Sequence, residues 1–382
     1  MRTLRFYGPL WLAALSALTG CGEPFAAGAA STTSASSSSG TGGGGAGGDG
    51  GAGGGGGVTM ASSSSSTSGG GGEGGCGACK EGEFCTASET CVRCADRGGL
   101  LSFGTPAEIE VEGTSPAFPR VREEAGEDGA TQRLVYVASF GPDRQIATAT
   151  GRPWTAGAIV ASAMVNSPQA ESGPLLLPVD ALSPREGFAT GSLLFDRVLP
   201  GPGSLRQLFV ADALEATAAE TFGPLNMDGG SHSVAVAHAA RPYRYWFMSE
   251  HQDDGGITHR LVTKRAHDAE AQALDITLPG DCPAQGDDLA PWVTPDGGVL
   301  FFQAPYSPRG NCAQASVLRS FYVKLGPDGQ PADGQPARML LSNLAPTVAV
   351  MTPSLSPDEC TLYLASNLDA DGKQRLYAAS RR

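Results

Sequence analysis

The sequence has little positive charge, and this shortage limits the partners it can have. It contains 26 lysine and arginine residues against 39 aspartate and glutamate residues, which gives a formal net charge of −13. A protein of this charge is repelled by the phosphate backbone of DNA or RNA. We therefore expect no nucleic-acid partner.

Long apolar segments and familiar catalytic motifs are also missing. Beyond the first 20 residues, no segment has the roughly 20 apolar residues that a membrane-spanning helix needs. The sequence lacks G-x-S-x-G, H-E-x-x-H and P-loop motifs, which removes the common signatures of hydrolases, metalloproteases and nucleotide-binding proteins. We therefore single out no catalytic residue and expect no cofactor.

The first 20 residues have the layout of a secretory signal peptide, with two arginines ahead of an apolar run at 6–18. The residues that follow, LTGC at 18–21, resemble the bacterial lipobox. This resemblance implies cleavage before Cys21, lipid attachment to its thiol and anchoring in a membrane. It also implies the outer membrane, facing the periplasm or the cell surface, because Gly22 stands where inner-membrane lipoproteins carry aspartate. A plain secreted protein with a free Cys21 is the alternative.

Glycine and serine dominate the next segment, 21–75, which follows the signal peptide. Such a composition cannot bury enough apolar surface to offset the entropy of ordering, so we expect a disordered tether between the lipidated cysteine and the folded part. A glycosylated or wall-threading stalk is the alternative. As a Gly-rich coil the tether would span on the order of 40 Å.

A cysteine-rich segment is predicted at 76–97, with C-x-x-C pairs that zinc or a redox site could use. An exported protein meets an oxidising environment, so we expect disulfides instead. Lipidation of Cys21 leaves eight of the nine cysteines, which permits four disulfides. The eight candidates are Cys76, Cys79, Cys85, Cys91, Cys94, Cys282, Cys312 and Cys360.

The cysteine count links this segment to the rest of the chain. Five candidates lie in the segment, so complete pairing requires at least one bridge to the downstream part. Cys282 and Cys312 are a plausible pair, which leaves Cys360 as the candidate partner for the odd cysteine. The connectivity stays open, because eight cysteines allow 105 pairings.

The main domain is predicted at 98–382 and should be all-β. Short runs rich in valine, leucine, tyrosine and phenylalanine alternate there with glycine, proline and aspartate, which is typical of strands and turns. The candidate strand pairs are RLVYVASF with RQIATAT, GAIVASAMV with PLLLPVD, GSLLFDRVL with RQLFVADAL, YRYWFMSE with THRLVTKR, GVLFFQAPY with RSFYVKL, and TLYLASN with RLYAAS. Six such units indicate a repeat architecture.

Two units share a clearer pattern. APWVTPDGGVLFFQAP at 290–305 and MTPSLSPDECTLYLASN at 351–367 each have a proline, a short strand, a Ser/Thr-Pro-Asp turn and an aromatic-rich strand. They resemble the TolB-like repeat, P-x-x-S-P-D-G-x-x-L-Y-F-x-S, which implies a β-propeller with Tyr363 in its core, and extrapolation from the six units predicts six blades. A seven-bladed ring or an irregular β-sandwich is the alternative. Glu359-Cys360 replaces the turn glycine of the family, so we expect a disulfide to hold this position without the geometry that glycine allows.

Two acidic segments are candidate metal sites. SEHQDDGGITH contains Glu250, His251, Asp253, Asp254 and His259, and NLDADG contains Asn367, Asp369 and Asp371. The first stands between two strand-like runs, and the second lacks the acidic twelfth residue of a calcium loop. We interpret both as hairpin loops and predict no metal. Trp154, Trp246 and Trp292 are expected to pack between blades.

The resemblance to TolB-like propellers favours a non-enzymatic platform that binds a protein or glycan. The alternative is a hydrolase or lyase that acts on extracellular or cell-wall polysaccharide, because propeller enzymes gather catalytic residues from several blades without a linear motif. A structural role in the envelope is the third possibility. We predict the platform.

Overall fold

The computed structural model describes Lys80, Glu83–Cys85, Cys91–Asp96 and, with gaps, residues 101–382; the longest gaps are 178–191 and 308–316. The described residues lie in one compact unit. The predicted signal peptide, Cys21 and the tether at 21–75 lie outside the described residues. Among the described residues no helix is long and apolar enough to cross a membrane.

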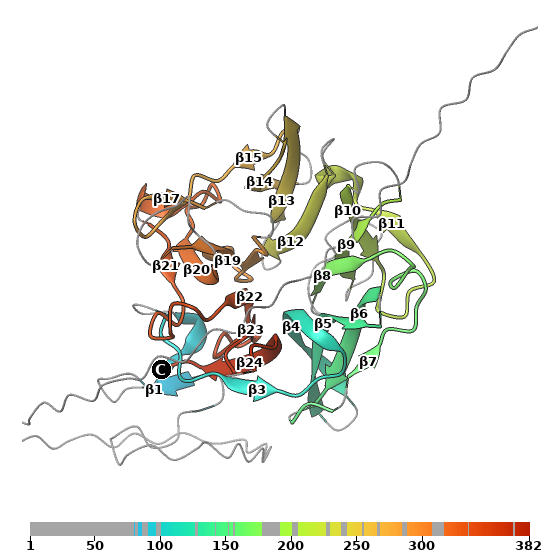
Figure 1. Ribbon diagram of the computed structural model, residues 1–382, viewed down its shortest axis with the longest axis horizontal. Helices are drawn as coiled ribbons and strands as arrows, with labels where there is room; N and C mark the ends of the chain where they lie inside the picture. Colours follow the sequence, from blue (N-terminus) through green and yellow to red (C-terminus); the bar gives the residue numbers. More distant parts are fainter. Residues whose placement is uncertain are drawn as a thin grey trace, which may run out of the picture. The chain divides into compact units, whose positions relative to one another are not determined.

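Five four-stranded antiparallel sheets form the blades of a β-propeller, arranged around a common axis (Figure 1). Blade 1 contains β4 (Thr114–Gly126), β5 (Gly129–Phe140), β6 (Asp143–Thr150) and β7 (Ala158–Ile159). Blade 2 contains β8 (Glu171–Leu176), β9 (Leu193–Val198), β10 (Arg206–Ala211) and β11 (Ala219–Thr221). Blade 3 contains β12 (Ser231–Ala237), β13 (Arg244–Asp253), β14 (Gly256–Arg265) and β15 (Gln272–Ala273).

The last two blades complete the ring. Blade 4 contains β18 (Trp292–Val293), β19 (Val299–Tyr306), β20 (Val317–Lys324) and β21 (Arg338–Met339). Blade 5 contains β22 (Val350–Leu355), β23 (Thr361–Ser366), β24 (Arg375–Ser380) and β3 (Ala107–Ile109). Outside the blades lie β1 (Glu83–Cys85), β2 (Cys91–Arg93), β16 (Thr277–Leu278), β17 (Cys282–Pro283), and the short 3-10 helices η1 (Cys94–Asp96), η2 (Gly223–Leu225) and η4 (Ala332–Gly334).

The prediction of an all-β propeller is confirmed, but the prediction of six blades is wrong. Five of the six candidate strand pairs are the middle hairpins of the five blades. The remaining pair, GAIVASAMV with PLLLPVD, is divided between two blades, because its first half contributes β7 to the edge of blade 1 and its second half contributes β8, the innermost strand of blade 2. Strand-like composition therefore does not tell which neighbouring strands share a sheet.

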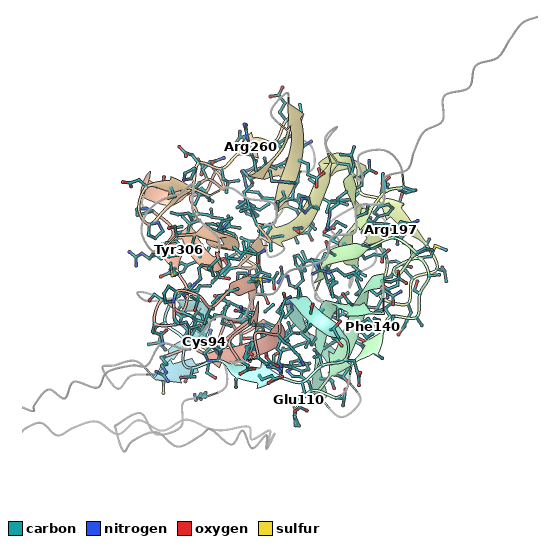
Figure 2. The ribbon with its side chains drawn as sticks, viewed as in Figure 1. Cys94, Glu110, Phe140, Arg197, Arg260 and Tyr306 are labelled. Carbon is teal, nitrogen blue, oxygen red and sulfur yellow. A yellow bond between two sulfur atoms is a disulfide. The ribbon has the colours of Figure 1, made fainter. Side chains whose placement is uncertain are left out.

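The chain closes the ring in blade 5. β3, from the start of the domain, pairs with β24 at its end, with Ile109 opposite Leu376. Just before β3, Cys94 forms a disulfide with Cys360, which follows β22; Cys94 lies beside the strands of blade 5 (Figure 2). The closure therefore has both a hydrogen-bonded and a covalent part.

Side chains alternate between the two faces of each strand and fill the space between blades. Trp246 and Tyr363 are at most 1% exposed, and the indole Nε1 of Trp246 donates a hydrogen bond to the Gly329 carbonyl at 3.0 Å. Trp154 and Trp292 pack edge-on against Tyr363 and Phe301, at 6.3 and 5.4 Å between ring centroids. Trp154 and Trp246 therefore contact a neighbouring blade, as the sequence predicted, whereas the ring contact of Trp292 is within its own blade.

The two Ser/Thr-Pro-Asp turns have the same hydrogen bonds. Asp296 accepts from the Thr294 hydroxyl and the Gly298 N–H, and Asp358 accepts from the Ser356 hydroxyl and the Cys360 N–H. Gly297 and the residue that replaces it, Glu359, both have positive φ, 76° and 60°. The expectation that this turn avoids the glycine geometry is therefore wrong: Glu359 adopts the left-handed conformation itself.

Candidate functional site

The innermost strands share a backbone irregularity. In β4, β8, β12 and β22 the pairing register shifts where one residue bulges, and a residue just before β18 has the same left-handed conformation. These residues are Phe118, Gly173, Ser233, Ala290 and Thr352, with φ between 39° and 54°. Four of them are not glycine, and proline follows four of the five. Such conformations are costly and concentrate at functional sites, so the strands nearest the axis are the place to look.

Side chains of neighbouring blades hold these strained positions. The Ser233 N–H donates to Asp196 Oδ2 at 3.0 Å, and the Phe118 N–H donates to Thr352 Oγ1 at 3.0 Å. The Thr352 N–H in turn donates to Gln303 Oε1 at 2.6 Å. Each bond crosses from one blade to the next, so the buried polar residues involved have a structural role.

Arg120 ties blades 1, 4 and 5 together near the axis. Its side chain is buried, and its guanidinium donates to the carbonyls of Pro119 at 2.9 Å and of Pro291 and Pro353 at 3.4 Å. A buried cation whose donors meet backbone carbonyls serves to bind blades together. We therefore place the reactive chemistry elsewhere.

Blade 3 brings together a carboxylate and two imidazoles. His232 comes from β12, Glu250 from β13 and His259 from β14; Glu250 lies directly opposite His259, and His232 lies diagonally across from Glu250. Residues related in this way share one face of a sheet. Glu250 Oε1 is 3.4 Å from His232 Nε2 and 3.6 Å from His259 Nε2, and the two rings are perpendicular with centroids 5.8 Å apart.

His232 is the most enclosed of the three. Its side chain is 3% exposed, against 11% for Glu250 and for His259. Its Nδ1 has a long contact of 3.4 Å with the Ser233 hydroxyl, and its Nε2 makes no hydrogen bond. Burial lowers the pKa of His232 to about 4, which the negative charge of Asp196 partly opposes. His232 is therefore a neutral imidazole with a free nitrogen beside a carboxylate.

A network in blade 2 fixes the backbone at this site. Asp196 is fully buried and accepts hydrogen bonds from the Ser172 hydroxyl at 2.6 Å and from Arg206 at 2.9 Å, in addition to the Ser233 N–H. Arg206 and Asp196 thus form an ion pair. Because Ser233 follows His232 in the chain, the network fixes the backbone from which the His232 side chain extends.

Gly230 leaves room for the Glu250 side chain. A β-carbon at Gly230, where φ is 107°, would lie 2.7 Å from Glu250 Oε2 and 3.1 Å from the Arg206 carbonyl oxygen. The Gly230 carbonyl also accepts the Glu250 N–H at 3.1 Å. The glycine therefore lets the backbone approach the carboxylate closely.

The sequence identified part of this cluster. Glu250 and His259 belong to the segment interpreted as a hairpin, and the strands do form one, with Asp253 opposite Gly256. Asp254 lies outside the described residues, as do the side chains of His251 and Asp253. The third member, His232, was missed because it is on another strand. A signal existed: it is a titratable residue in the strand SHSVAVA, all of which is buried.

The second acidic segment is a hairpin loop, as predicted. Asp369 and Asp371 each lie 2.5 Å from a guanidinium nitrogen of Arg375, and Asp369 also accepts from the Tyr377 hydroxyl at 2.6 Å. The arginine engages both carboxylates. The cluster therefore stabilises the turn between β23 and β24.

Among the described residues, four of the predicted cysteines form disulfides. Besides the pair of Cys94 with Cys360, Cys91 and Cys282 are disulfide-bonded. Cys85 lies opposite Cys91 in the β1–β2 pair. Cys76, Cys79 and Cys312 lie outside the described residues, so the proposed pairing of Cys282 with Cys312 stays a prediction.

No protein-family profile and no curated protein matches the chain. Solved structures do resemble it. A glycosyl hydrolase from Bacteroides ovatus is 11% identical, with a TM-score of 0.40 over 78% of this chain and 88% of that chain. The α-L-arabinofuranosidase of Podospora anserina, solved with cellotriose, is 11% identical, with a TM-score of 0.38 over 75% and 92%. The catalytic domain of a GH62 α-L-arabinofuranosidase from Coprinopsis cinerea is 12% identical, with a TM-score of 0.38 over 74% and 95%.

The expectation of a non-enzymatic binding platform is wrong by this comparison. The similar structures are named as glycoside hydrolases and arabinofuranosidases and not as binding platforms. The likeness concerns the fold and assigns no substrate to this chain. No profile match places its repeats in the TolB-like family.

Proposed function

We propose that this chain is an enzyme that breaks down polysaccharide, with its reactive centre at His232, Glu250 and His259. One observation carries the proposal: a buried imidazole nitrogen on the innermost strand of blade 3 has no hydrogen bond and lies 3.4 Å from a carboxylate of the next strand. Buried polar groups are normally satisfied, and an unsatisfied one calls for an explanation. A place beside the carboxylate that transfers a proton during catalysis supplies one.

The cluster contains one carboxylate and two imidazoles, which are groups that can transfer protons. In hydrolysis of a glycosidic bond, the oxygen of water bonds to the anomeric carbon and water loses a proton, the bond from that carbon to the leaving oxygen breaks, and the leaving oxygen gains a proton. Glu250, which is 11% exposed, is the group through which we route the proton. His232 is a positioning residue that acts through Glu250.

Polysaccharide is the substrate class that fits the predicted location. The predicted signal peptide and the lipobox-like residues support a mature protein outside the cytoplasm, anchored through Cys21, where cell-wall and extracellular polysaccharides are available. Anchoring is part of the proposal. Mass spectrometry of the mature N-terminus should find a lipid on Cys21, and an uncleaved signal or an unmodified Cys21 would overturn it.

The test of function uses the full-length chain purified from membranes in detergent with its disulfides intact. We expect it to release reducing ends from at least one member of a panel of polysaccharides that includes arabinan and cell-wall glycans, and Glu250→Gln should lower kcat/KM at least about 100-fold. Asp369→Asn, a matched loss of one carboxylate in the hairpin of blade 5, should keep full activity. An ultraviolet-absorbing unsaturated product would instead indicate a lyase. A panel without any cleavage, or an unaffected Glu250→Gln variant, contradicts the proposal.

A further inference from the structure

We propose that His232, Glu250 and His259 bind one divalent transition-metal ion, for which zinc is the reference. The inference concerns the site of the proposed function and adds a resident metal to it. Among the described residues, these three offer ligand atoms that all lie within 4.8 Å of one another.

The spacing of the ligand atoms fits a metal centre. Metal–ligand bonds of 2.0–2.2 Å in tetrahedral geometry place neighbouring ligand atoms about 3.3–3.6 Å apart. Glu250 Oε1 is 3.4 Å from His232 Nε2 and 3.6 Å from His259 Nε2. The cluster therefore needs only small side-chain shifts to converge on one ion.

The chemistry of the donors selects the kind of metal. Two imidazoles and one carboxylate suit zinc and its neighbours in the first transition row, whereas calcium and magnesium prefer sets of oxygen ligands. Three protein ligands leave a fourth position open, which is the pattern of catalytic zinc sites. Glu250 and His259 are each 11% exposed, so solvent reaches these two side chains. At the open position the metal would lower the pKa of bound water and supply a nucleophile.

The surroundings prepare His232 to act as a ligand. Its Nε2 is buried without a hydrogen bond, while its Nδ1 faces the Ser233 hydroxyl at 3.4 Å. Ligating histidines commonly use their second nitrogen for a contact that orients the ring. Asp196 holds Ser233 and also meets the charge of Arg206, so Arg206 does not confront the ion with an unpaired positive charge.

The test measures metal binding directly in the full-length chain, purified in detergent without a histidine tag and with its disulfides intact. We expect elemental analysis after dialysis against zinc to find one ion per chain that competes with a chromophoric chelator. Cobalt substitution should give the absorption of a tetrahedral site.

Matched variants locate the ion. Each of His232→Ala, Glu250→Gln and His259→Gln should weaken zinc binding at least about 100-fold, and Asp369→Asn with Asp371→Asn should leave it unchanged. The partly exposed His259 allows the test if His232→Ala fails to fold. Absence of stoichiometric zinc, or equal binding by the His259→Gln variant, overturns the inference.

The activity assay separates this inference from the proposed function. Zinc bound at the cluster without any cleavage of polysaccharide would overturn the function and leave the metal site. Cleavage that persists in a chelator, by protein that binds no zinc, would overturn the metal site and leave the function.

Discussion

Blades 3 and 5 contain the same strained bulge next to the propeller axis and use it differently. In blade 5, the Thr352 N–H bonds to Gln303, and its hydroxyl accepts the Phe118 N–H. In blade 3, the Ser233 N–H likewise bonds to Asp196, but the residue before it, His232, keeps a buried nitrogen without a hydrogen bond. The buried polar groups at the two bulges thus serve the structure, whereas His232 has bonding capacity left over, and this is why we place the proposed site there.

The largest expected effect on stability comes from the closure of blade 5. Replacing Cys94 and Cys360 together with alanine removes a bridge between residues 266 positions apart, which should lower the free energy of unfolding by about 5 kcal/mol because the unfolded chain gains freedom. Denaturant unfolding checks this. Zinc binding by the fraction that remains folded should not change; a loss of binding there would show that blade 5 is not merely structural.

A matched pair of substitutions compares the residues that hold the two bulges. Asp196→Ala removes a buried carboxylate from Arg206 and the Ser233 N–H and should lower the free energy of unfolding by about 3 kcal/mol. Gln303→Ala leaves the Thr352 N–H without its acceptor and should cost about 1–2 kcal/mol. Only Asp196→Ala should also weaken zinc binding. Equal effects of both variants on zinc would contradict the division between the blades.

The smallest expected effect concerns the Ser/Thr-Pro-Asp turn, which occurs once in blade 4 and once in blade 5. Gly297→Ala places a β-carbon at φ 76°, 3.2 Å from the β-carbon of Ala237, and should lower the free energy of unfolding by about 1 kcal/mol. Thermal unfolding checks this cost. An unchanged or raised midpoint would show that the left-handed position of this turn accepts a side chain without strain, and that Glu359 in blade 5 is not strained either.

Local chemistry made much of the fold predictable. The Ser/Thr-Pro-Asp turns, the short aromatic strands and the buried Tyr363 follow from residues close in sequence, and the bridge between Cys94 and Cys360 agrees with the cysteine count. The number of blades did not follow, because β7 and β8 lie close together in the chain but belong to different sheets.

The candidate site was predictable only in part. Glu250 and His259 face each other across one hairpin, so their proximity is local. His232 reaches them only because β12 pairs with β13 through a bulge, and the burial that leaves its nitrogen without a hydrogen bond depends on the packed propeller. Neither fact has a signature in the sequence around Glu250.

Anomalous diffraction at the zinc edge, from crystals of the zinc-loaded chain, tests the central claim most directly. We predict one peak in blade 3, about 2.0–2.2 Å from His232 Nε2, Glu250 Oε1 and His259 Nε2, and none at Asp369 and Asp371 in blade 5. A blade 3 cluster without a peak, or a peak only among the blade 5 carboxylates, would contradict the account.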